Sequence, residues 1–286
     1  MNKKKVYEVL TWASSFLEKH GRDPHIAKVL IEHHLQVDRN TFHMILRDEM
    51  KEEQYRAFMS DVKAHVETGI PVQHLVGYEY FYGRQFAVNE HVLIPRFETE
   101  ELVYHLIQLI QSKYRDETVT IVDIGTGSSV IATTLALELS NAVVYATDIS
   151  EAALRVATQN AADLGANVTF MQGSFLEPII EANIHPQIIV SNPPYIAKAE
   201  IDELEDTVKN YDPHVALFAP NKGLAAYESI VDQSKRIPSI ERICMEIGYE
   251  QAKAVTNIVA KTYPAAQIET IVDMNGKDRI ISAIVR

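Results

Sequence analysis

The stretch "VTIVDIGTGSSVIA", residues 119–132, decides the fold class of this chain. An apolar, β-branched run typical of a buried strand leads through a glycine-rich turn into residues that suit the first turns of a helix. Gly125 allows the tight turn, and Gly127 lets the backbone approach a ligand at the helix N-terminus. Asp148 ends the next apolar run, at the spacing from which a carboxylate reaches ribose hydroxyls. A plain strand–helix turn would explain the glycines alone, whereas the three residues together predict a site for an adenosine-containing cofactor.

Outward from this stretch, strand-like and helical segments alternate as far as the C-terminus. The strand-like runs are "VTIVDIG", "AVVYATD", "NVTFMQG", "QIIVSN", "RICMEIG", "AQIETIVDM" and "RIISAIV". We expect helices between most of them, at residues 128–139, 151–164, 223–237 and 249–261. Apolar strands separated by helices predict an α/β fold with a parallel, doubly wound, Rossmann-like sheet. Asn275-Gly276 between the final two runs is a hairpin signal, so we expect the last strand to be antiparallel.

The first part of the chain has a different periodicity. Apolar residues recur at helical spacing in "VYEVLTWASSFLEKHG", "DPHIAKVLIEHHLQV" and "KEEQYRAFMSDVKAHVETG". Residues 1–72 are therefore expected to form a small all-helical domain. Residues 73–286 would form the second domain, which begins with a linking β-hairpin around Gly83 in the aromatic-rich "GYEYFYGRQFAVNE". An extended piece and a helix that begins near Glu98 follow.

Composition narrows the class of function. The chain has 286 residues and a formal net charge of -12 at pH 7, which disfavours general binding to nucleic acid because phosphate contacts need a basic surface. Its single cysteine, Cys244, lies in an apolar run and cannot form an internal disulfide. The N-terminus is basic but continues as an amphipathic helix, and no apolar run approaches the ~20 residues of a membrane span. We therefore expect a cytoplasmic protein.

The glycine turn departs from the dinucleotide fingerprint G-x-G-x-x-G, because Val130 occupies its last position. It resembles instead the class I S-adenosylmethionine methyltransferase motif, an acidic residue followed by G-x-G-x-G, with Ser129 in the place of the third glycine. "MQGSFLEP", residues 171–178, lies where such enzymes contact the adenine. The resemblance implies S-adenosylmethionine as cofactor and S-adenosylhomocysteine as product. It implies cofactor contacts at Asp123, Gly125, Thr126, Gly127, Ser128, Ser129, Asp148, Ser174, Phe175 and Asn192.

"IIVSNPPY", residues 188–195, places two prolines at the end of another buried strand, at the sheet edge where α/β proteins bind ligands. Proline fixes its own φ and restricts the residue before it, so Asn192, Pro193 and Pro194 have little conformational freedom. The Asn192 side-chain oxygen and the Pro193 carbonyl can accept both N–H bonds of a planar –NH2 group, and Tyr195 can cover its π-face. Such acceptors would oppose delocalisation of the nitrogen lone pair and aim it at a methyl sulfonium, without a metal or a covalent nucleophile. The alternative is that the prolines only end the strand.

The N-P-P-Y motif with this cofactor site resembles enzymes that methylate exocyclic or amide –NH2 groups. Three further segments resemble one family among them, the release factor glutamine methyltransferases, also called the HemK family. "PVQHLVGYEYFYG" resembles its P-x-Q-Y-I-x-G-x-x-x-F-x-G segment, "VLIPRFETEELV" its V-L-I-P-R-P-E-T-E signature, and "DMNGKDRIISA" its D-x-x-G-x-x-R ending. His74 and Phe97 depart from the first two patterns, as Ser129 departs from the glycine motif. The resemblance covers essentially the whole chain.

This resemblance implies a seven-stranded class I methyltransferase sheet. It also implies methylation of the glutamine amide nitrogen, N5, in the Gly-Gly-Gln motif of peptide chain release factors, which modulates translation termination. The helical domain would recognise the release factor, and neither a membrane nor a nucleic-acid substrate is expected. The residues implied to bind the substrate are Asn192, Pro193, Pro194 and Tyr195, of which Asn192, Pro193 and Tyr195 would be catalytic.

Three alternative functions stay open at the level of sequence. A glutamine methyltransferase that acts on a ribosomal protein shares the catalytic core, and only the helical leader and the hairpin separate the two. A nucleic-acid adenine N6-methyltransferase is disfavoured by the acidic net charge. A non-enzymatic binding module gives no reason to combine Asp123, Asp148 and Asn192 at three strand ends.

Two segments also allow more than one interpretation. Arg96, Glu98 and Glu100 fit the floor of a pocket and an ordinary helix start equally well. Residues 198–214, acidic and close behind N-P-P-Y, could form a mobile lid or a solvated connection.

Overall fold

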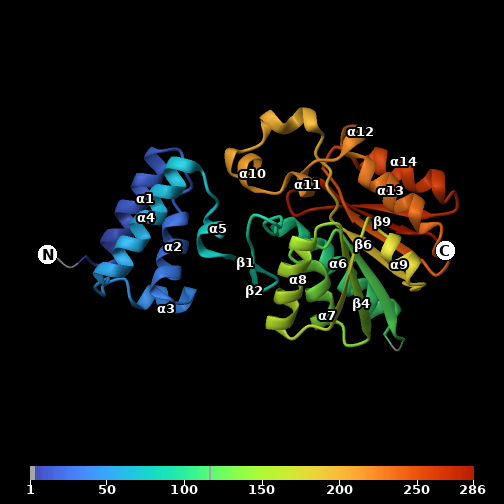
Figure 1. Cartoon of the computed structure of the whole chain (residues 1–286), viewed down its shortest axis with the longest axis horizontal. Helices are drawn as coiled ribbons and strands as arrows, with labels where there is room; N and C mark the ends of the chain where they lie inside the picture. Colours follow the sequence, from blue (N-terminus) through green and yellow to red (C-terminus); the bar gives the residue numbers. More distant parts are fainter. Residues whose placement is uncertain (1–3, 116) are drawn as a thin grey trace. The chain divides into compact units, whose positions relative to one another are not determined.

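The structure is a computed structural model that describes residues 4–115 and 117–286. The described chain divides into two compact units (Figure 1). The helical unit comprises the chain up to Gly77 together with Glu205–Tyr211, and the sheet unit comprises Tyr78–Leu204 and Asp212–Arg286. Along the described residues, no helix combines the length and the apolar character that crossing a membrane requires.

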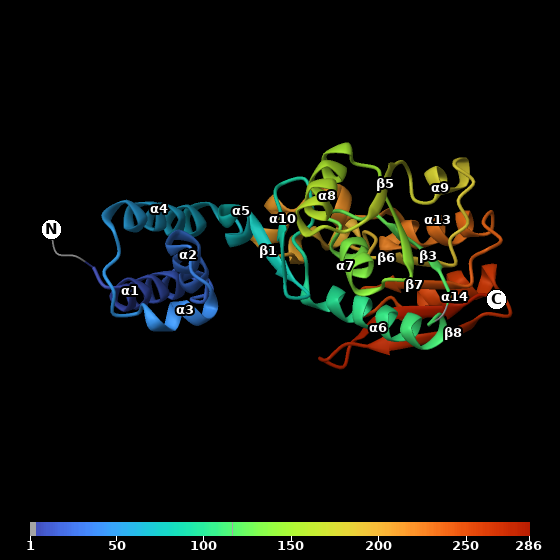
Figure 2. The ribbon, with the colours of Figure 1, turned by 90° about the horizontal axis from the view of Figure 1, so that it is seen from below.

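The helical unit is built from amphipathic helices that bury a common apolar interior. They are α1 (Val6–Lys19), α2 (Ile26–Leu35), α3 (Arg39–Met44), α4 (Glu52–Thr68) and α5 (Val72–Val76). On α1 the buried residues Val6, Val9, Ala13 and Leu17 recur at helical spacing, and this stripe packs against α2 and α4 (Figure 2). The predicted helical leader is confirmed. The helices α3 and α5 were not predicted, because they are too short to show a repeating apolar face.

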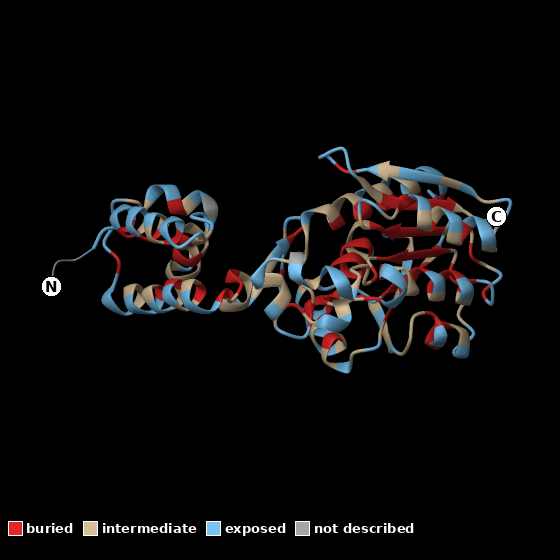
Figure 3. Ribbon diagram, turned by 90° about the horizontal axis from the view of Figure 1, so that it is seen from above, coloured by how far each residue is buried: buried red, intermediate tan, exposed pale blue. Residues whose placement is uncertain are grey.

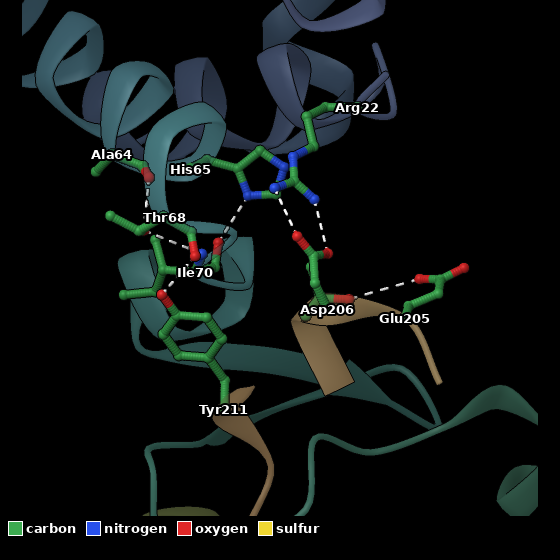
Figure 4. Close-up of polar contacts among 9 residues, drawn as sticks. Arg22, Ala64, His65, Thr68, Ile70, Glu205, Asp206 and Tyr211 are labelled. Carbon is green, nitrogen blue, oxygen red and sulfur yellow. Dashed lines mark hydrogen bonds and ion pairs between the residues drawn. The ribbon is translucent and has the colours of Figure 1, made fainter. Parts of the chain in front are cut away.

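A short segment from much later in the chain completes the helical unit. The helix α10 (Asp206–Tyr211) carries Asp206, which accepts two hydrogen bonds from the Arg22 guanidinium at 2.8 and 2.9 Å (Figure 4). The Tyr211 hydroxyl donates to the Thr68 carbonyl at 2.8 Å. The middle of the acidic segment 198–214 is therefore a packed part of the helical unit and not a solvated connection throughout.

The sheet unit opens with the predicted hairpin of β1 (Tyr78–Phe81) and β2 (Arg84–Ala87), and α6 (Phe97–Lys113) follows. The alternating part consists of β3 (Val119–Ile124), α7 (Val130–Glu138), β4 (Ala142–Asp148), α8 (Glu151–Leu164), β5 (Val168–Gln172), α9 (Glu177–Glu181), β6 (Ile188–Ser191), the 3-10 helix η1 (Lys198–Glu203), α11 (His214–Leu217), α12 (Pro220–Gly223), α13 (Ala225–Ser234), β7 (Arg242–Glu246), α14 (Ala252–Thr262), β8 (Gln267–Val272) and β9 (Asp278–Ile284).

Within the described residues, seven strands form one sheet in the order β5-β4-β3-β6-β7-β9-β8. The strands β3 to β7 pair in parallel, whereas β9 is antiparallel to both β7 and β8. The predicted doubly wound sheet with an antiparallel last strand is thus confirmed. The chain runs outward from β3 through β4 to β5 and then returns to β6 on the other side of β3. Ligands bind α/β sheets at such a reversal, at the carboxyl ends of the strands.

Apolar side chains on both faces of the sheet form the core of this unit. Ile121 of β3 faces the layer that contains α6 and α7, whereas Val122 faces the layer of α13 and α14. In Figure 1, α7 and α8 lie on the opposite side of the sheet from α13 and α14. Figure 3 shows that the inner strands are buried, while the edge strand β8 consists of exposed and intermediate residues. A sheet covered on both faces holds the carboxyl ends of its inner strands in fixed positions.

Candidate active site

The turn after β3 has the backbone conformation that its glycines predict. Gly125 and Gly127 have φ values of +69° and +54°, in the left-handed region that side chains with a Cβ rarely adopt. The N–H groups of Gly125 and Thr126 donate to the Thr147 carbonyl at 2.9 and 3.0 Å, which fixes the turn to the end of β4. No described atom lies within 4 Å of a Cβ added at either glycine. The backbone conformation, and not crowding, therefore requires glycine here.

Asp123 lies behind this turn and has no exposed surface. Its Oδ2 accepts hydrogen bonds from the Thr126 hydroxyl at 2.6 Å and from the Ala132 N–H at 3.2 Å. Burial raises the pKa of Asp123 to about 7, although both hydrogen bonds oppose this shift. This carboxyl group braces the turn and the start of α7 from inside, and its contact with the cofactor stays a prediction.

Asp148 ends β4 beside the turn and is only partly buried. Its Oδ2 accepts from the Gly127 N–H and its Oδ1 from the Ser150 N–H, both at 2.9 Å. Each carboxylate oxygen keeps a second lone pair. Asp148 is thus held in place by the backbone and can still accept hydrogen bonds from a ligand.

A cavity of about 340 Å³ lies over the carboxyl ends of the parallel strands. Several predicted site residues line it, namely Gly125, Gly127, Asp148, Ser174, Phe175, Asn192 and Pro194. The other predicted residues do not line it, namely Asp123, Thr126, Ser128, Ser129, Pro193 and Tyr195. Asp148 is the one carboxylate among the described lining residues. The wall is otherwise apolar or neutral apart from His91, which suits a flat heterocycle attached to a sugar.

Thr126, Ser128 and Ser129 miss the cavity wall because the turn folds them inward, with at most 6% of each exposed. The Thr126 hydroxyl bonds to Asp123, and the Ser129 hydroxyl lies 2.9 Å from that of Thr133. The paired hydroxyls of Thr126 and Ser129 stabilise the turn itself. The cofactor contacts of Thr126, Ser128 and Ser129 stay predictions.

The N-P-P-Y segment is anchored at both ends. The hydroxyl of Ser191, the last residue of β6, donates to the Ile124 carbonyl at 2.7 Å. At the other end, the Tyr195 carbonyl accepts from the Gln251 side-chain amide at 2.9 Å. Ile196 then forms an isolated parallel bridge with Phe218, through its N–H to Leu217 and its carbonyl to Ala219, both at 3.0 Å. Asn192 therefore projects to the cavity wall from a fixed backbone.

The three aromatic and proline neighbours of Asn192 differ in their surroundings. Pro193 is buried and Pro194 is half-buried on the cavity wall. Tyr195 packs against the core layer of α13 and α14, and burial raises its pKa to about 12. The Tyr195 phenol is therefore neutral at physiological pH.

Comparisons with known proteins show what the whole chain is similar to. Residues 8–77 match the family described as PrmC N-terminal domain, and residues 115–241 match the methyltransferase domain family. The release factor glutamine methyltransferase of Bacillus cereus is 42% identical over 98% of this chain and 99% of its own length. That of Bacillus subtilis is 42% identical over 99% of this chain and 98% of its own length.

The chain belongs to the release factor glutamine methyltransferase family. As a member of this family it is an enzyme, and the class predicted from its motifs is confirmed. Among solved structures, the catalytic domain of human METTL16 in complex with MAT2A 3'UTR hairpin 1 has a TM-score of 0.56 at 15% identity, over 96% of this chain and 90% of that one. At this identity the likeness concerns the fold alone.

The departures of this chain from the family patterns lie off the cavity wall. Ser129 has a φ of +67°, a left-handed conformation that favours glycine and costs other residues on the order of 1 kcal/mol. Phe97 is the first residue of α6 and is 59% exposed. The His74 ring lies 6.4 Å from that of Tyr211 within the helical unit.

The family signature in residues 92–100 mostly braces the framework. The Arg96 guanidinium bonds at 2.7 Å to Asp212, whose side chain is fully buried. Glu100 accepts from the Tyr82 N–H at 2.7 Å and so ties α6 to the hairpin. Glu98 lies in the first turn of α6, and these three residues do not line the described cavity. The interpretation as a helix start is therefore the better one for Arg96, Glu98 and Glu100.

Three further stretches of the wall and one neighbour of Asn192 were not predicted from the sequence. The missed wall residues are His91, Val92, Leu93, Ile149, Ser150, Ala153, Val215, Ala216, Phe218, Ala219, Pro220, Ala225, Ala226 and Ser229. For the third stretch, the apolar run "HVALFAP", residues 214–220, behind an acidic segment was the available signal. Thr99, which accepts a hydrogen bond from the Asn192 amide at 3.1 Å, gave no signal because it lies within an ordinary helix start.

Proposed function

We propose that this chain transfers a methyl group from S-adenosylmethionine to the side-chain amide nitrogen, N5, of the glutamine in the Gly-Gly-Gln motif of peptide chain release factors. The observation that carries the proposal is the position of Asn192 on the wall of the same cavity as Gly127 and Asp148. The Asn192 side chain, which can accept a hydrogen bond from an amide, therefore lies next to a pocket suited to a nucleoside. The names of the relatives that match the full length support the same substrate.

The cavity fits S-adenosylmethionine in size and chemistry. Its volume of about 340 Å³ is in the range of small-molecule sites. The free lone pairs of Asp148 suit ribose hydroxyls, and Phe175 offers an apolar surface for adenine. When bound, the cofactor supplies an electrophilic methyl group on a sulfonium. The residues that would hold it are Gly125, Gly127, Asp148, Ser174 and Phe175, and Asn192 lines the same cavity without being required for its affinity.

The chemistry of this proposal rests on two acceptors next to the cavity. The Asn192 side-chain oxygen and the Pro193 carbonyl would accept the two N–H bonds of the glutamine amide. Since prolines restrict both residues, little ordering remains to be done when the substrate arrives. Hydrogen bonds to both protons oppose amide resonance as the nitrogen becomes pyramidal, and they orient its lone pair. The neutral Tyr195 ring would cover the amide and exclude water.

We further propose that the helical domain, residues 1–72, recognises the release factor, while residues 73–286 carry out the transfer. The match of residues 8–77 to the PrmC N-terminal domain family supports this division. A substrate of this kind would place the enzyme in the cytoplasm. A ribosomal-protein glutamine is the second candidate because it needs the same acceptors, but the names of the relatives do not favour it.

A substrate panel tests the proposal. Purified protein and labelled S-adenosylmethionine are offered a release factor, a ribosomal-protein preparation and DNA in separate reactions. We expect label in the release factor alone, and none in a release factor whose Gly-Gly-Gln glutamine is changed to glutamate. Label only in ribosomal protein or only in DNA would overturn the assignment.

A further inference from the structure

Behind Asn192 lies a chain of three polar side chains from three separate elements. The Asn192 amide nitrogen donates to the Thr99 hydroxyl oxygen at 3.1 Å, and the Thr99 hydroxyl donates to the Glu246 carboxylate at 2.7 Å. Thr99 belongs to the first turn of α6 and Glu246 ends β7. They are 3% and 1% exposed, so of the three side chains only Asn192 reaches the cavity wall.

The Glu246 carboxylate, at the end of this series of hydrogen bonds, fixes which group donates in each of them. An ionised carboxylate can only accept, so Thr99 must direct its single proton at Glu246. The Thr99 oxygen can then only accept, and Asn192 must present its –NH2 group to it. The Asn192 side-chain oxygen consequently points away from Thr99 and stays able to accept a hydrogen bond from a ligand.

We propose that Thr99 and Glu246 are positioning residues that hold the amide of Asn192 with its oxygen toward the substrate nitrogen. The inference rests on the proposed function, because it explains how Asn192 is kept as an acceptor. The oxygen and the –NH2 group of a side-chain amide have similar sizes, so the group fits its pocket in two orientations. In the inverted orientation, the Asn192 –NH2 group would point at the –NH2 group of the glutamine, and neither could accept a hydrogen bond. The hydrogen bonds from Asn192 to Thr99 and from Thr99 to Glu246, here called the relay, disfavour this inverted orientation.

The burial of Glu246 indicates a use beyond packing. A carboxylate inside a protein is costly unless it is paired, and an apolar side chain of similar volume would be tolerated at least as well. The hydrogen bonds described for the nearby Arg279 go to Asp273 at 3.2 Å and to the Ile247 carbonyl at 3.3 Å. The Glu246 side chain is hydrogen-bonded by Thr99, which leads directly to Asn192, and a side-chain hydrogen bond with Asn192 itself also acts on Glu246.

The relay also predicts a pH dependence. Burial raises the pKa of Glu246 to about 7, against the opposing effects of the Thr99 hydrogen bond, the Arg279 charge and the hydrogen bond with Asn192. A protonated Glu246 could donate to Thr99, which could then donate to the Asn192 oxygen and allow the amide to invert. The fraction of correctly oriented enzyme should therefore rise with pH through about 7.

Two phenols and one guanidinium that face Glu246 do not change charge in this range. Burial raises the pKa of Tyr195 to about 12 and that of Tyr227 well above 10, so both phenols stay neutral. Arg279 on β9 keeps its positive charge, and Glu98 on α6 contributes a carboxylate that raises the pKa of Glu246 further.

The test compares Thr99→Val, Thr99→Ser and Glu246→Gln with the wild-type enzyme at saturating cofactor. Thr99→Val keeps the shape but removes the hydroxyl, so kcat should fall about 10- to 100-fold while the Kd for S-adenosylmethionine stays within about 2-fold. Thr99→Ser restores the hydroxyl and should lie within about 3-fold of wild type. Glu246→Gln should remove the acidic limb of the kcat–pH profile. A Thr99→Val enzyme with wild-type kcat, or a Thr99→Ser enzyme equally impaired, would overturn the proposal.

A substrate-free measurement separates this inference from the proposed function. The side-chain amide of Asn192 is followed by NMR in protein labelled with 15N-asparagine, and its signal is assigned by its loss in Asn192→Ala. Its shift should titrate near pH 7 in the wild type and not in Glu246→Gln. An amide signal that is independent of pH and unchanged in Thr99→Val contradicts the relay, even if the substrate panel supports the release factor.

Discussion

At the scale of single residues, the acidic residues at the strand ends have different roles. Asp148 keeps lone pairs for a ligand, whereas Asp123 is buried behind the turn with a pKa raised to about 7. Asn192 adds an amide whose orientation is set by Thr99. Cofactor binding and methyl transfer should therefore respond differently to changes at Asp148 and Asn192.

Replacing Asn192 should abolish turnover with little change in cofactor binding. Asn192→Ala removes one of the two acceptors for the substrate amide, so we expect kcat to fall by at least about 100-fold. The backbone restriction by Pro193 persists, and the Kd for S-adenosylmethionine measured by calorimetry should stay within a few-fold. Weakened cofactor affinity with normal turnover at saturation would refute the role given to Asn192.

Replacing Asp148 should show the opposite pattern. Asp148→Ala removes a charged acceptor from the cavity, and hydrogen bonds to charged groups contribute roughly 1.5–3 kcal/mol, so the Kd should rise about 10- to 100-fold. Turnover at saturating cofactor should stay within a few-fold. Asp232→Ala is a matched control, because this aspartate is 73% exposed and pairs only with Lys235 among the described salt bridges. Unchanged cofactor affinity in Asp148→Ala would exclude the predicted contact.

At the scale of elements, the site depends on how helices and loops begin. The helix α6 starts at Phe97, and its first turn carries Thr99 to the back of Asn192. Arg96 before it is extended, with φ -111° and ψ 148°, which is the conformation that a following proline favours. Proline is also well suited to the first position of a helix.

Phe97→Pro should consequently stabilise the protein. The ring would restrict the unfolded chain at a position that already has a compatible backbone, which contributes about 0.4–1 kcal/mol. Urea unfolding measures the change. Tyr104→Pro is the control on the same helix, because Tyr104 is 57% exposed but lies in the interior of α6, where proline costs roughly 3 kcal/mol. A Phe97→Pro protein less stable than wild type would show that Phe97 packs more than its exposure indicates.

At the scale of the whole molecule, the sequence predicts features that follow from a repeating apolar pattern or from a short turn motif. Alternating apolar runs predict the sheet, and Asn275-Gly276 predicts its antiparallel end. Contacts between distant residues leave no such pattern, since Thr99 and Glu246 are 147 positions apart. The inward direction of Asp123 depends on how α7 packs, which a glycine motif does not encode. The sequence likewise did not predict that α10 belongs to the helical unit, because the contacts of α10 are with residues distant in sequence.

Removing the ion pair that holds α10 should loosen this segment without unfolding the protein. The Arg22 hydrogen bonds lower the pKa of Asp206, so the pair weakens as pH falls through that lowered pKa. Because a partly exposed pair contributes about 0–1 kcal/mol, Arg22→Ala should change global stability little while limited proteolysis near residues 205–211 becomes faster. Arg56→Ala is the control, since its exposed pair with Glu52 lies within α4. Equal proteolysis in both variants would argue against this tie.

The split composition of the helical unit affects its synthesis. Since Glu205–Tyr211 closes this unit, the ribosome must deliver most of the sheet before the amino-terminal helices receive their final partner. A nascent or truncated chain that stops at Gly77 therefore lacks Asp206 and leaves the Arg22 guanidinium in water. Grafting the α10 sequence behind α5 through a new linker would restore this partner to the isolated helices.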